Sequence, residues 1–317
     1  MRKRICYIVI TLLLAGGAVV CAIRWQAWFG MPDEPRWTGE TREYRFPAWE
    51  EDRTPGSLDI LVLGDIHNAL LREDYNALAE RVPQADAVAQ TGDWLDRGYP
   101  YYYQLLLREW TDCRLAGLPV IPCPGNHEYT KGLRKTLSPV WSDAFTVPDN
   151  GPVEVPGVSY YIDLPAVRFI VIDTNPLVRL VDLTRTQTWV EQTMKSAGNR
   201  YIVVMMHHPV LSAREGRFNP IVYATFRYTL GKADLVLAGH DHSYMRMGNF
   251  VVLNTGGTAK PQKEQIRLQE TIVNCEEPVY AVLHIDEPCP DHPSPLLFCT
   301  YRMRDNVLID SLHVSHD

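Results

Sequence analysis

The sequence predicts an α/β domain made of two stacked sheets with helices on their outer faces. Three observations lead to this expectation. From residue 58 onward, short apolar runs typical of buried strands alternate with runs whose apolar residues recur at helical spacing. Beyond residue 249 the strand-like runs follow one another without helices, which favours a second, more antiparallel sheet. The 317 residues are 46% hydrophobic and 22% charged, a globular composition with enough apolar residues for a large core.

Each expected element follows from its local pattern. The run from Leu58 to Leu63 is rich in Leu, Ile and Val, as in a buried strand, whereas Tyr75, Leu78 and Val82 recur at the spacing of one helix face. Pro165-Ala166 separates two strand-like runs by a connection short enough for a hairpin. We expect strands at 58–63, 85–90, 119–122, 159–164, 167–173, 201–206, 235–238, 249–255, 279–286, 296–302 and 307–314, and helices at 74–82, 102–116, 184–197 and 220–230.

The N-terminal residues differ from the rest of the chain. Nineteen residues without a charge, Ile5 to Ile23, are preceded by Arg2-Lys3-Arg4 and followed by Arg24. A helix of this length is about 28 Å long, close to the thickness of a bilayer core, and the preceding bases favour an N-terminus inside. Residues 1–24 therefore predict a signal-anchor or transmembrane segment that holds the protein at the membrane, with its domain outside the cytoplasm. A cleavable signal peptide, giving a secreted or periplasmic protein, is the alternative.

The remaining bulk properties bound the domain and its partners. Residues 25–57 contain four prolines and no sustained helical period, which predicts a tether, and 58–317 is the expected folded domain. Outside residues 1–30 the chain has 27 Lys and Arg against 38 Asp and Glu, a balance of −11, which excludes a basic nucleic-acid footprint. Five cysteines lie outside the N-terminal segment, and they permit one or two disulfides, for example Cys113 with Cys123, or buried free thiols.

Short polar clusters follow several of the strand-like runs. Because open α/β sheets place their chemistry at the carboxyl ends of the strands, we expect these clusters to meet. Their imidazoles and side-chain oxygens, without a thiolate, suit Mn²⁺, Fe²⁺ or Zn²⁺. Seven ligands are too many for one ion with an open position, but they suit two ions that share a carboxylate. The seven are Asp65, His67, Asp93, Asn126, His207, His240 and His242.

The order and spacing of these clusters resemble the calcineurin-like metallophosphoesterase superfamily. The resemblance covers residues 58–258 and rests on five blocks: Gly64-Asp65-Ile66-His67, Gly92 to Gly98, Gly125-Asn126-His127-Glu128, His207-His208-Pro209 and Gly239-His240-Asp241-His242. It implies a four-layer α/β/β/α sandwich of two mixed sheets flanked by helices. It also implies a hydrolase acting on phosphate ester bonds with two divalent metal ions, Mn, Fe or Zn.

The resemblance assigns a role to each residue of the blocks. Asp65, His67 and His242 would bind the first metal, and Asn126, His207 and His240 the second. Asp93 would bridge the two, and a hydroxide between them would attack phosphorus. His127 would act as the general acid, the Asp96 carboxylate would orient its imidazole, and Arg97 would contact a phosphate oxygen. His208 would be a substrate contact or a support for its neighbour.

Departures from individual branches narrow the resemblance. Asn68 stands where the serine/threonine protein phosphatases have a glycine, and Asp96 stands where purple acid phosphatases have a tyrosine. Membrane-tethered bacterial phosphoesterases remain the nearest general resemblance. The expected substrate is a phosphorylated small molecule, nucleotide or lipid. The alternatives are a phosphodiesterase or pyrophosphatase acting on nucleotides or lipid head groups and, outside enzymes, a catalytically silent binding module.

Overall fold

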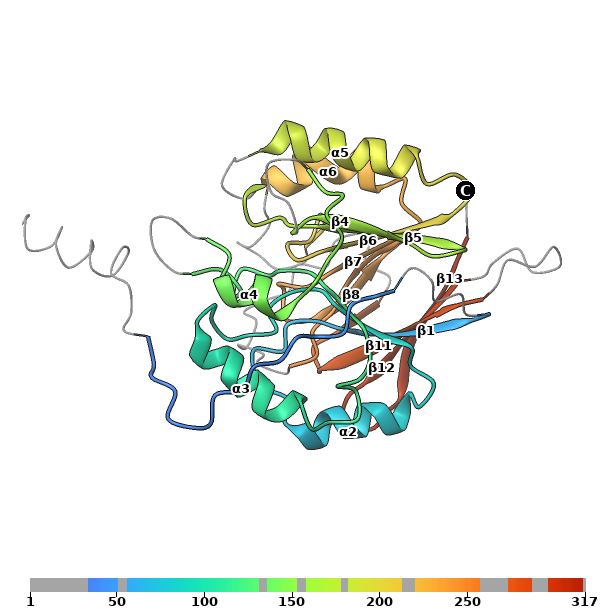
Figure 1. Ribbon diagram of the computed structural model, residues 1–317. Coiled ribbons are helices and arrows are strands. Elements are labelled where there is room, and N and C mark those ends of the chain that lie inside the picture. Colours follow the sequence, from blue (N-terminus) through green and yellow to red (C-terminus); the bar gives the residue numbers. More distant parts are fainter. Residues whose placement is uncertain are drawn as a thin grey trace, which may run out of the picture.

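Two sheets lie face to face and carry helices on both outer sides in the computed structural model of the protein (Figure 1). The structure describes residues 34–50, 56–130, 136–152, 158–177, 182–212, 220–256, 273–286 and 296–315. The six-stranded sheet has the order β13-β12-β11-β1-β2-β3, and the seven-stranded sheet has the order β10-β8-β9-β7-β6-β5-β4. The predicted four-layer sandwich of two mixed sheets is confirmed.

Strands and helices alternate along the chain up to β7, except that β4 and β5 follow one another directly as an antiparallel pair. The strands are β1 (Leu58–Leu63), β2 (Ala87–Gln90), β3 (Val120–Pro122), β4 (Tyr160–Asp163), β5 (Val167–Ile172), β6 (Tyr201–Met206), β7 (Leu235–Ala238), β8 (Tyr244–Met247), β9 (Phe250–Val252), β10 (Val273–Cys275), β11 (Val279–Ile285), β12 (Leu296–Arg302) and β13 (Leu308–Val314). The helices are α2 (Arg72–Arg81), α3 (Pro100–Trp110), α4 (Pro139–Ala144), α5 (Leu183–Lys195) and α6 (Pro220–Leu230).

Three apolar clusters separate the layers. Ile60, Phe169 and Leu283 belong to the cluster between the two sheets, where alternate side chains of the strands meet. The opposite faces of the same strands pack on helices: Leu61 of β1 belongs with the buried residues of α2 and α3, and Val204 of β6 with those of α5 and α6. Strands buried on both faces explain why their sequences are nearly continuous apolar runs.

The expected division of strands between the two sheets is wrong. The last three strand-like runs do not start a separate sheet, because β11 pairs antiparallel with β1 and adds β12 and β13 to the first sheet. The run at 249–255 instead contributes β9 to the seven-stranded sheet. A physical reason is that β1 is buried on both faces and has β2 on one side only, so its other edge needs a partner. The sequence patterns also missed α4, β8 and β10.

Residues 34–50, in the predicted tether, pack on the domain. Phe46 is 2% exposed and stacks on Phe145 with ring centroids 4.6 Å apart. The carbonyl of Pro47 accepts a hydrogen bond from the N–H of Val120 over 2.9 Å, so this segment covers the outer edge of β3. The division into tether and domain otherwise stays a prediction.

The prediction of a membrane-anchored protein outside the cytoplasm is corrected. In the part of the chain that the structure describes, no helix is both long and apolar enough to cross a bilayer. The uncharged run from Ile5 to Ile23, on which the prediction was based, lies outside the described residues. The anchor and the localisation derived from it are therefore withdrawn.

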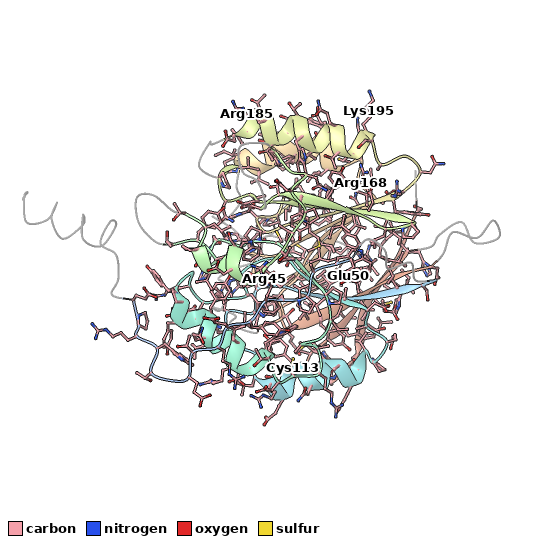
Figure 2. The ribbon with its side chains drawn as sticks, viewed as in Figure 1. Arg45, Glu50, Cys113, Arg168, Arg185 and Lys195 are labelled. Atoms are coloured by element: carbon pink, nitrogen blue, oxygen red, sulfur yellow. The ribbon has the colours of Figure 1, made fainter. Side chains whose placement is uncertain are left out.

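The suggested disulfide between Cys113 and Cys123 is also wrong. Both thiols are free, as are those of Cys275 and Cys299. Cys113 lies in the outer layer beside α2 and α3 (Figure 2), whereas Cys123 follows β3 and is buried between the sheets. Burial raises the pKa of both thiols, which keeps them protonated and unreactive.

Candidate metal centre

The predicted ligands meet at one edge of the sandwich. Five loops carry them, and each loop follows the carboxyl end of a parallel strand: β1, β2, β3, β6 or β7. Main-chain hydrogen bonds align the first two loops, since the N–H groups of Asp65 and His67 donate to the carbonyls of Gly92 and Asp93 over 3.1 and 3.0 Å. The expectation that clusters far apart in sequence come together is met for all seven residues.

One set of donor atoms comes from Asp65, His67, Asp93 and His242, which offer one atom each within 4.8 Å of one another. The Nε2 atoms of His67 and His242 are 3.1 Å apart. Asp65 Oδ1 lies 3.7 Å from Nε2 of His67 and 3.7 Å from Nε2 of His242. These four side chains therefore surround one point.

A second set surrounds a neighbouring point around His207. Nε2 of His207 lies 3.2 Å from Oδ1 of Asn126, 3.2 Å from Nδ1 of His240 and 3.2 Å from Oδ2 of Asp93. Nδ1 of His207 lies 3.1 Å from the carbonyl of Thr91, to which it donates. That bond leaves the Nε2 lone pair directed at the other three donors, as a metal-binding histidine requires.

Asp93 belongs to both sets through a single oxygen. Its Oδ2 lies 3.7 Å from Nε2 of His67 and 3.2 Å from Nε2 of His207. Burial disfavours the carboxylate, but the adjacent His207 holds the pKa of Asp93 well below its usual range. Burial likewise opposes the charged imidazole, but Asp93 outweighs it and raises the pKa of His207 to about 9. Without a metal, His207 therefore carries the proton that balances the charge of Asp93, and a bound cation would take the place of that proton.

The donor sets fit divalent metal ions. Metal–ligand bonds of about 2.1 Å give donor–donor edges of about 3.0 Å in an octahedron and about 3.4 Å in a tetrahedron. The shortest separations, 3.1 and 3.2 Å, fall in this range, and the longest, 3.7 Å, exceed the tetrahedral edge by about 0.3 Å. In addition, Asp65 Oδ1 is buried without a hydrogen-bond partner, while Oδ2 of the same carboxylate accepts the N–H of His240 over 2.7 Å. A buried carboxylate oxygen without a donor is costly unless a cation balances it.

The backbone at this edge is held in an unusual conformation. Positive φ angles occur at Asp65, His67, Asn68, Asp93, His240 and His242, between 49° and 75°. In the rest of the described chain, only Asp182 and Asn306 among non-glycine residues share this left-handed conformation. Such residues each cost of order 1 kcal/mol or more and concentrate at functional sites, where the surroundings enforce them.

Comparisons with known proteins agree with this arrangement. Residues 58–244, more than half of the chain, match the family model of calcineurin-like phosphoesterases. The chain belongs to this family. Its members are hydrolases that act on phosphate esters and use divalent metals. The family assignment made from the five sequence blocks is thus confirmed.

Individual relatives of this chain are distant. This chain is 27% identical to the glycerophosphodiester phosphodiesterase GpdQ of Enterobacter lignolyticus (strain SCF1) over 186 residues. The matched stretch covers 56% of this chain and 62% of that protein. The purple acid phosphatase PPD1 from yellow lupin (Lupinus luteus) seeds has a TM-score of 0.63 at 16% identity, covering 83% of this chain and 54% of that one. GAP50, described as the anchor in the inner membrane complex of Plasmodium, has a TM-score of 0.59 at 12% identity, and the match covers 82% of this chain and 89% of that one. The two structures show the fold alone.

Glu128 has a structural role that the sequence pattern did not reveal. Its buried carboxylate accepts hydrogen bonds from the N–H groups of Asp93, Leu95 and Gly125 over 2.9, 3.0 and 2.7 Å. One side chain thereby joins the loop after β2 to the loop after β3. Burial, and then the charge of Asp93, raises the pKa of Glu128 to about 7. Its position beside His127 in the third block was the only sequence signal.

The contact between His127 and Asp96 differs from the prediction. Nδ1 of His127 donates to the main-chain carbonyl of Asp96 and not to its carboxylate, which is 47% exposed. Nε2 of His127 is 3.9 Å from Oδ2 of Asp93, so this nitrogen faces the donor sets. Burial lowers the pKa of His127. Arg97 lies at the rim, with Nε 3.8 Å from the Asp96 carboxylate.

His208 is buried next to the second donor set. Its Nδ1 lies 2.7 Å from the hydroxyl of Thr174, the second residue after β5. One of its ring nitrogens is within 4.8 Å of a nitrogen of His207 and of His240. The structure therefore places His208 against the site, supported by the neighbouring parallel strand.

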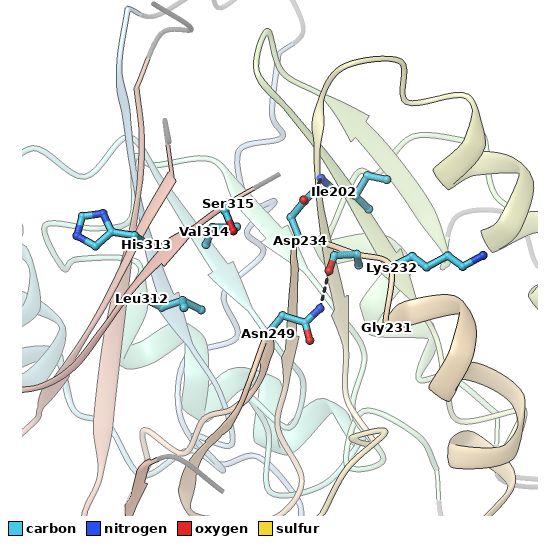
Figure 3. A pocket seen from close by; sticks show the side chains of 10 residues that line it. Ile202, Gly231, Lys232, Asp234, Asn249, Leu312, His313, Val314 and Ser315 are labelled. Carbon is cyan, nitrogen blue, oxygen red and sulfur yellow. Dashed lines mark hydrogen bonds between the residues drawn. The ribbon is translucent and has the colours of Figure 1, made fainter. Parts of the chain in front are cut away.

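A cavity of about 720 Å³ lies at the opposite edge of the sandwich (Figure 3). It is bounded by the turn between α6 and β7 and by the end of β13, and its lining includes Ile202, Lys232, Asn249 and Leu312. None of the predicted site residues contributes to it. Among the described residues, the potential metal-binding side chains converge at the edge opposite to this cavity, and the cavity itself brings together no such set.

Proposed function

We propose that this chain hydrolyses phosphate esters at a centre that holds two divalent cations. The observation that carries the proposal is the position of Asp93 Oδ2, 3.7 Å from Nε2 of His67 in one donor set and 3.2 Å from Nε2 of His207 in the other. Two ions held this close would supply an activated water and neutralise the charge that develops on the phosphoryl oxygens. Mn, Fe and Zn all suit the nitrogen and oxygen donors.

Each side chain has a defined task in this proposal. Asp65, His67 and His242 hold one cation, Asn126, His207 and His240 hold the other, and Asp93 is shared.

The chain's own proton donor in this proposal is His127. With Nδ1–H bound to the Asp96 carbonyl, its Nε2 faces the reacting centre and gives a proton to the leaving oxygen as the P–O bond breaks. The lowered pKa of His127 makes its protonated form a readier donor. Arg97 at the rim binds a phosphoryl oxygen. Asp96 contributes mainly through its carbonyl.

The proposed substrate is a phosphodiester with an alcohol leaving group. Support comes from the GpdQ relative, whose name describes a glycerophosphodiester phosphodiesterase and whose similarity covers 186 residues. The balance of −11 outside residues 1–30 makes local cations necessary for any anionic substrate. A preference for monoesters is distinguished from this by the assay below.

The test uses the purified full chain loaded with Mn²⁺. Turnover of bis(nitrophenyl) phosphate is compared with that of nitrophenyl phosphate, and bound metal is counted by elemental analysis. We expect release of nitrophenol that depends on added metal and is faster from the diester than from the monoester. Asp93→Asn should lose about 1,000-fold or more in kcat and at least one bound ion, because the shared ligand is weakened.

The matched control is Asp163→Asn. Asp163 is also a paired aspartate, bound through both oxygens to Arg168, which lies below α5 (Figure 2). Asp163 is opposite Arg168 at the start of β5, whereas the donor loops follow the ends of parallel strands. This variant should keep its metals and its turnover. Absence of metal-dependent release by the wild type, or full activity in Asp93→Asn, would refute the proposed function.

A further inference from the structure

Asn68 joins the loop after β1 to the loop that carries Asp96. Its Nδ2 donates to the main-chain carbonyl of Tyr102 in the first turn of α3 over 2.9 Å. Its Oδ1 accepts the main-chain N–H of Asp96 over 2.8 Å. Both ends of the carboxamide are therefore used, and together they hold the N–H of Asp96 relative to the start of α3.

The same Asp96 residue contacts His127. Its carbonyl accepts the Nδ1–H of the imidazole. A continuous series of hydrogen bonds thus runs from Tyr102 of α3 through Asn68 and the Asp96 main chain to the ring. The Asp96 carboxylate takes no part in this series, since Arg97 is its neighbour at the rim.

The backbone at Asn68 does not by itself require this side chain. Its φ of 57° is left-handed, a conformation that glycine adopts most readily and that asparagine tolerates better than most residues. Glycine occupies this place in the serine/threonine protein phosphatases that the first block resembles. What asparagine adds is the pair of hydrogen bonds to Tyr102 and Asp96.

We propose that Asn68 is a positioning residue that holds His127 ready for proton donation to the leaving group. The inference rests on the proposed function, in which Nε2–H of His127 protonates the leaving oxygen while its Nδ1–H stays on the Asp96 carbonyl. Errors of a fraction of an ångström in the position of a catalytic group are costly in rate. Asn68 limits such errors by holding the N–H of Asp96, one peptide unit before the Asp96 carbonyl to which the imidazole is bound.

The consequence is a dependence on the leaving group. A nitrophenolate leaves without help, so its departure needs little protonation, whereas a poor leaving group such as phenolate or an alkoxide needs the proton. Loosening His127 should therefore slow esters of poor leaving groups and spare nitrophenyl esters. A residue that merely stabilises the fold would affect all esters equally.

The test is the slope of log kcat against the leaving-group pKa for methyl aryl phosphates, from nitrophenyl to unsubstituted phenyl. The full-length Mn²⁺-loaded wild type is compared with Asn68→Gly, which keeps the left-handed backbone and removes both bonds. We expect the nitrophenyl ester to change by less than about threefold and the phenyl ester to slow by about 10-fold or more. Asn68→Asp keeps the acceptor for the Asp96 N–H, so its slope should lie between those of wild type and Asn68→Gly. The slope of His127→Ala should be steeper than that of Asn68→Gly.

Asn306→Gly is the matched control, since Asn306 has a φ of 60° and its Oδ1 accepts a hydrogen bond from Tyr280 in the distant turn between β12 and β13. It should leave the slope unchanged. Metal content and melting temperature establish that each variant is folded and loaded. Equal slopes in wild type and Asn68→Gly overturn this inference alone, whereas absence of turnover by the wild type overturns it together with the proposed function.

Discussion

The two edges of the sandwich differ in how their polar groups are used. One edge is formed by the loops that follow the carboxyl ends of the parallel strands, and we call it the carboxyl edge. Here imidazoles and carboxylates lie within 3 to 4 Å of one another, and one oxygen of Asp65 has no hydrogen-bond partner. At the opposite edge, the polar groups around the 720 Å³ cavity satisfy the local backbone. Asn249 donates to the carbonyl of Ala233 over 2.5 Å, and Asp234 accepts the N–H of Ile202 over 2.6 Å.

This difference shows that open volume is a weaker indicator of chemistry than unbalanced charge. The carboxyl edge also holds six of the eight non-glycine residues with positive φ in the described chain. Strained backbone and a carboxylate oxygen without a donor each cost free energy, and both persist where a bound ligand compensates. The opposite edge has a cavity of about 720 Å³, and none of the residues that line it has a positive φ angle.

After the loss of Asp93 itself, the largest effect should come from filling the space between the two central loops. A Cβ on Gly125 would lie 2.1 Å from Oδ1 of Asp93 and 2.3 Å from its nitrogen, so Gly125→Ala must displace the shared carboxylate. We expect kcat to fall about 100-fold with loss of bound metal, as for a 1 Å misplacement. Gly117→Ala, where a Cβ would meet nothing within 4 Å, should behave as wild type. Full activity in Gly125→Ala would mean that the loop spacing is not critical.

A smaller effect is expected from the carboxylate that links those loops. Glu128→Gln replaces one accepting oxygen by an amide nitrogen and so leaves one of the three N–H groups unpaired, at a cost of about 1–3 kcal/mol in the free energy of unfolding. Unfolding of the metal-loaded protein by a denaturant measures this loss in the free energy of unfolding. Glu80→Gln, which breaks an exposed ion pair with Arg114, should cost at most about 1 kcal/mol.

The same variant has a pH signature in the metal-free protein. Glu128 has its pKa raised to about 7, above the usual 4.5, so its protonated form is favoured on folding. Its contribution to stability is complete below pH 4.5 and is lost as the pH rises through about 7. The stability advantage of wild type over Glu128→Gln should therefore shrink between pH 5 and 8. If the stability advantage of wild type grew between pH 5 and 8, the raised pKa of Glu128 would be contradicted.

The smallest effect should come from the opposite edge. Lys232 lines the cavity there and lies far from the donor sets, so Lys232→Ala should leave kcat, KM and metal content unchanged. A drop in activity comparable to that of Gly125→Ala would break the distinction between the two edges.

Most of the fold followed from the sequence because its strands are short apolar runs with clear ends. The expected bounds of β1, β6, β7, α6 and β12 match the structure. The partner of β1 could not be predicted, because apolar runs such as β11 pair equally well with any exposed strand edge. The three residues of β10 are too short to show a period.

The candidate site was predictable as a set of residues but not as a network. Blocks of His, Asp and Asn after strands identified the seven donors, since ligand types are visible in the sequence. The roles of Glu128 and Asn68 depend on main-chain N–H and carbonyl groups brought from other loops, which no sequence pattern records. The same limitation explains why the Asp96 carboxylate was expected where its carbonyl is found.

The pairing of β1 with β11 also has a consequence for the time course of folding. Leu58 is opposite Ile285, so the partner strand leaves the ribosome more than 200 residues later. At the usual speed of synthesis this takes roughly 10 to 45 s, during which one edge of β1 has no partner. Pairing over such a sequence distance is slow, and an unpaired apolar edge invites association between nascent chains. The strand that leads into Asp65 is thus among the first made and the last completed.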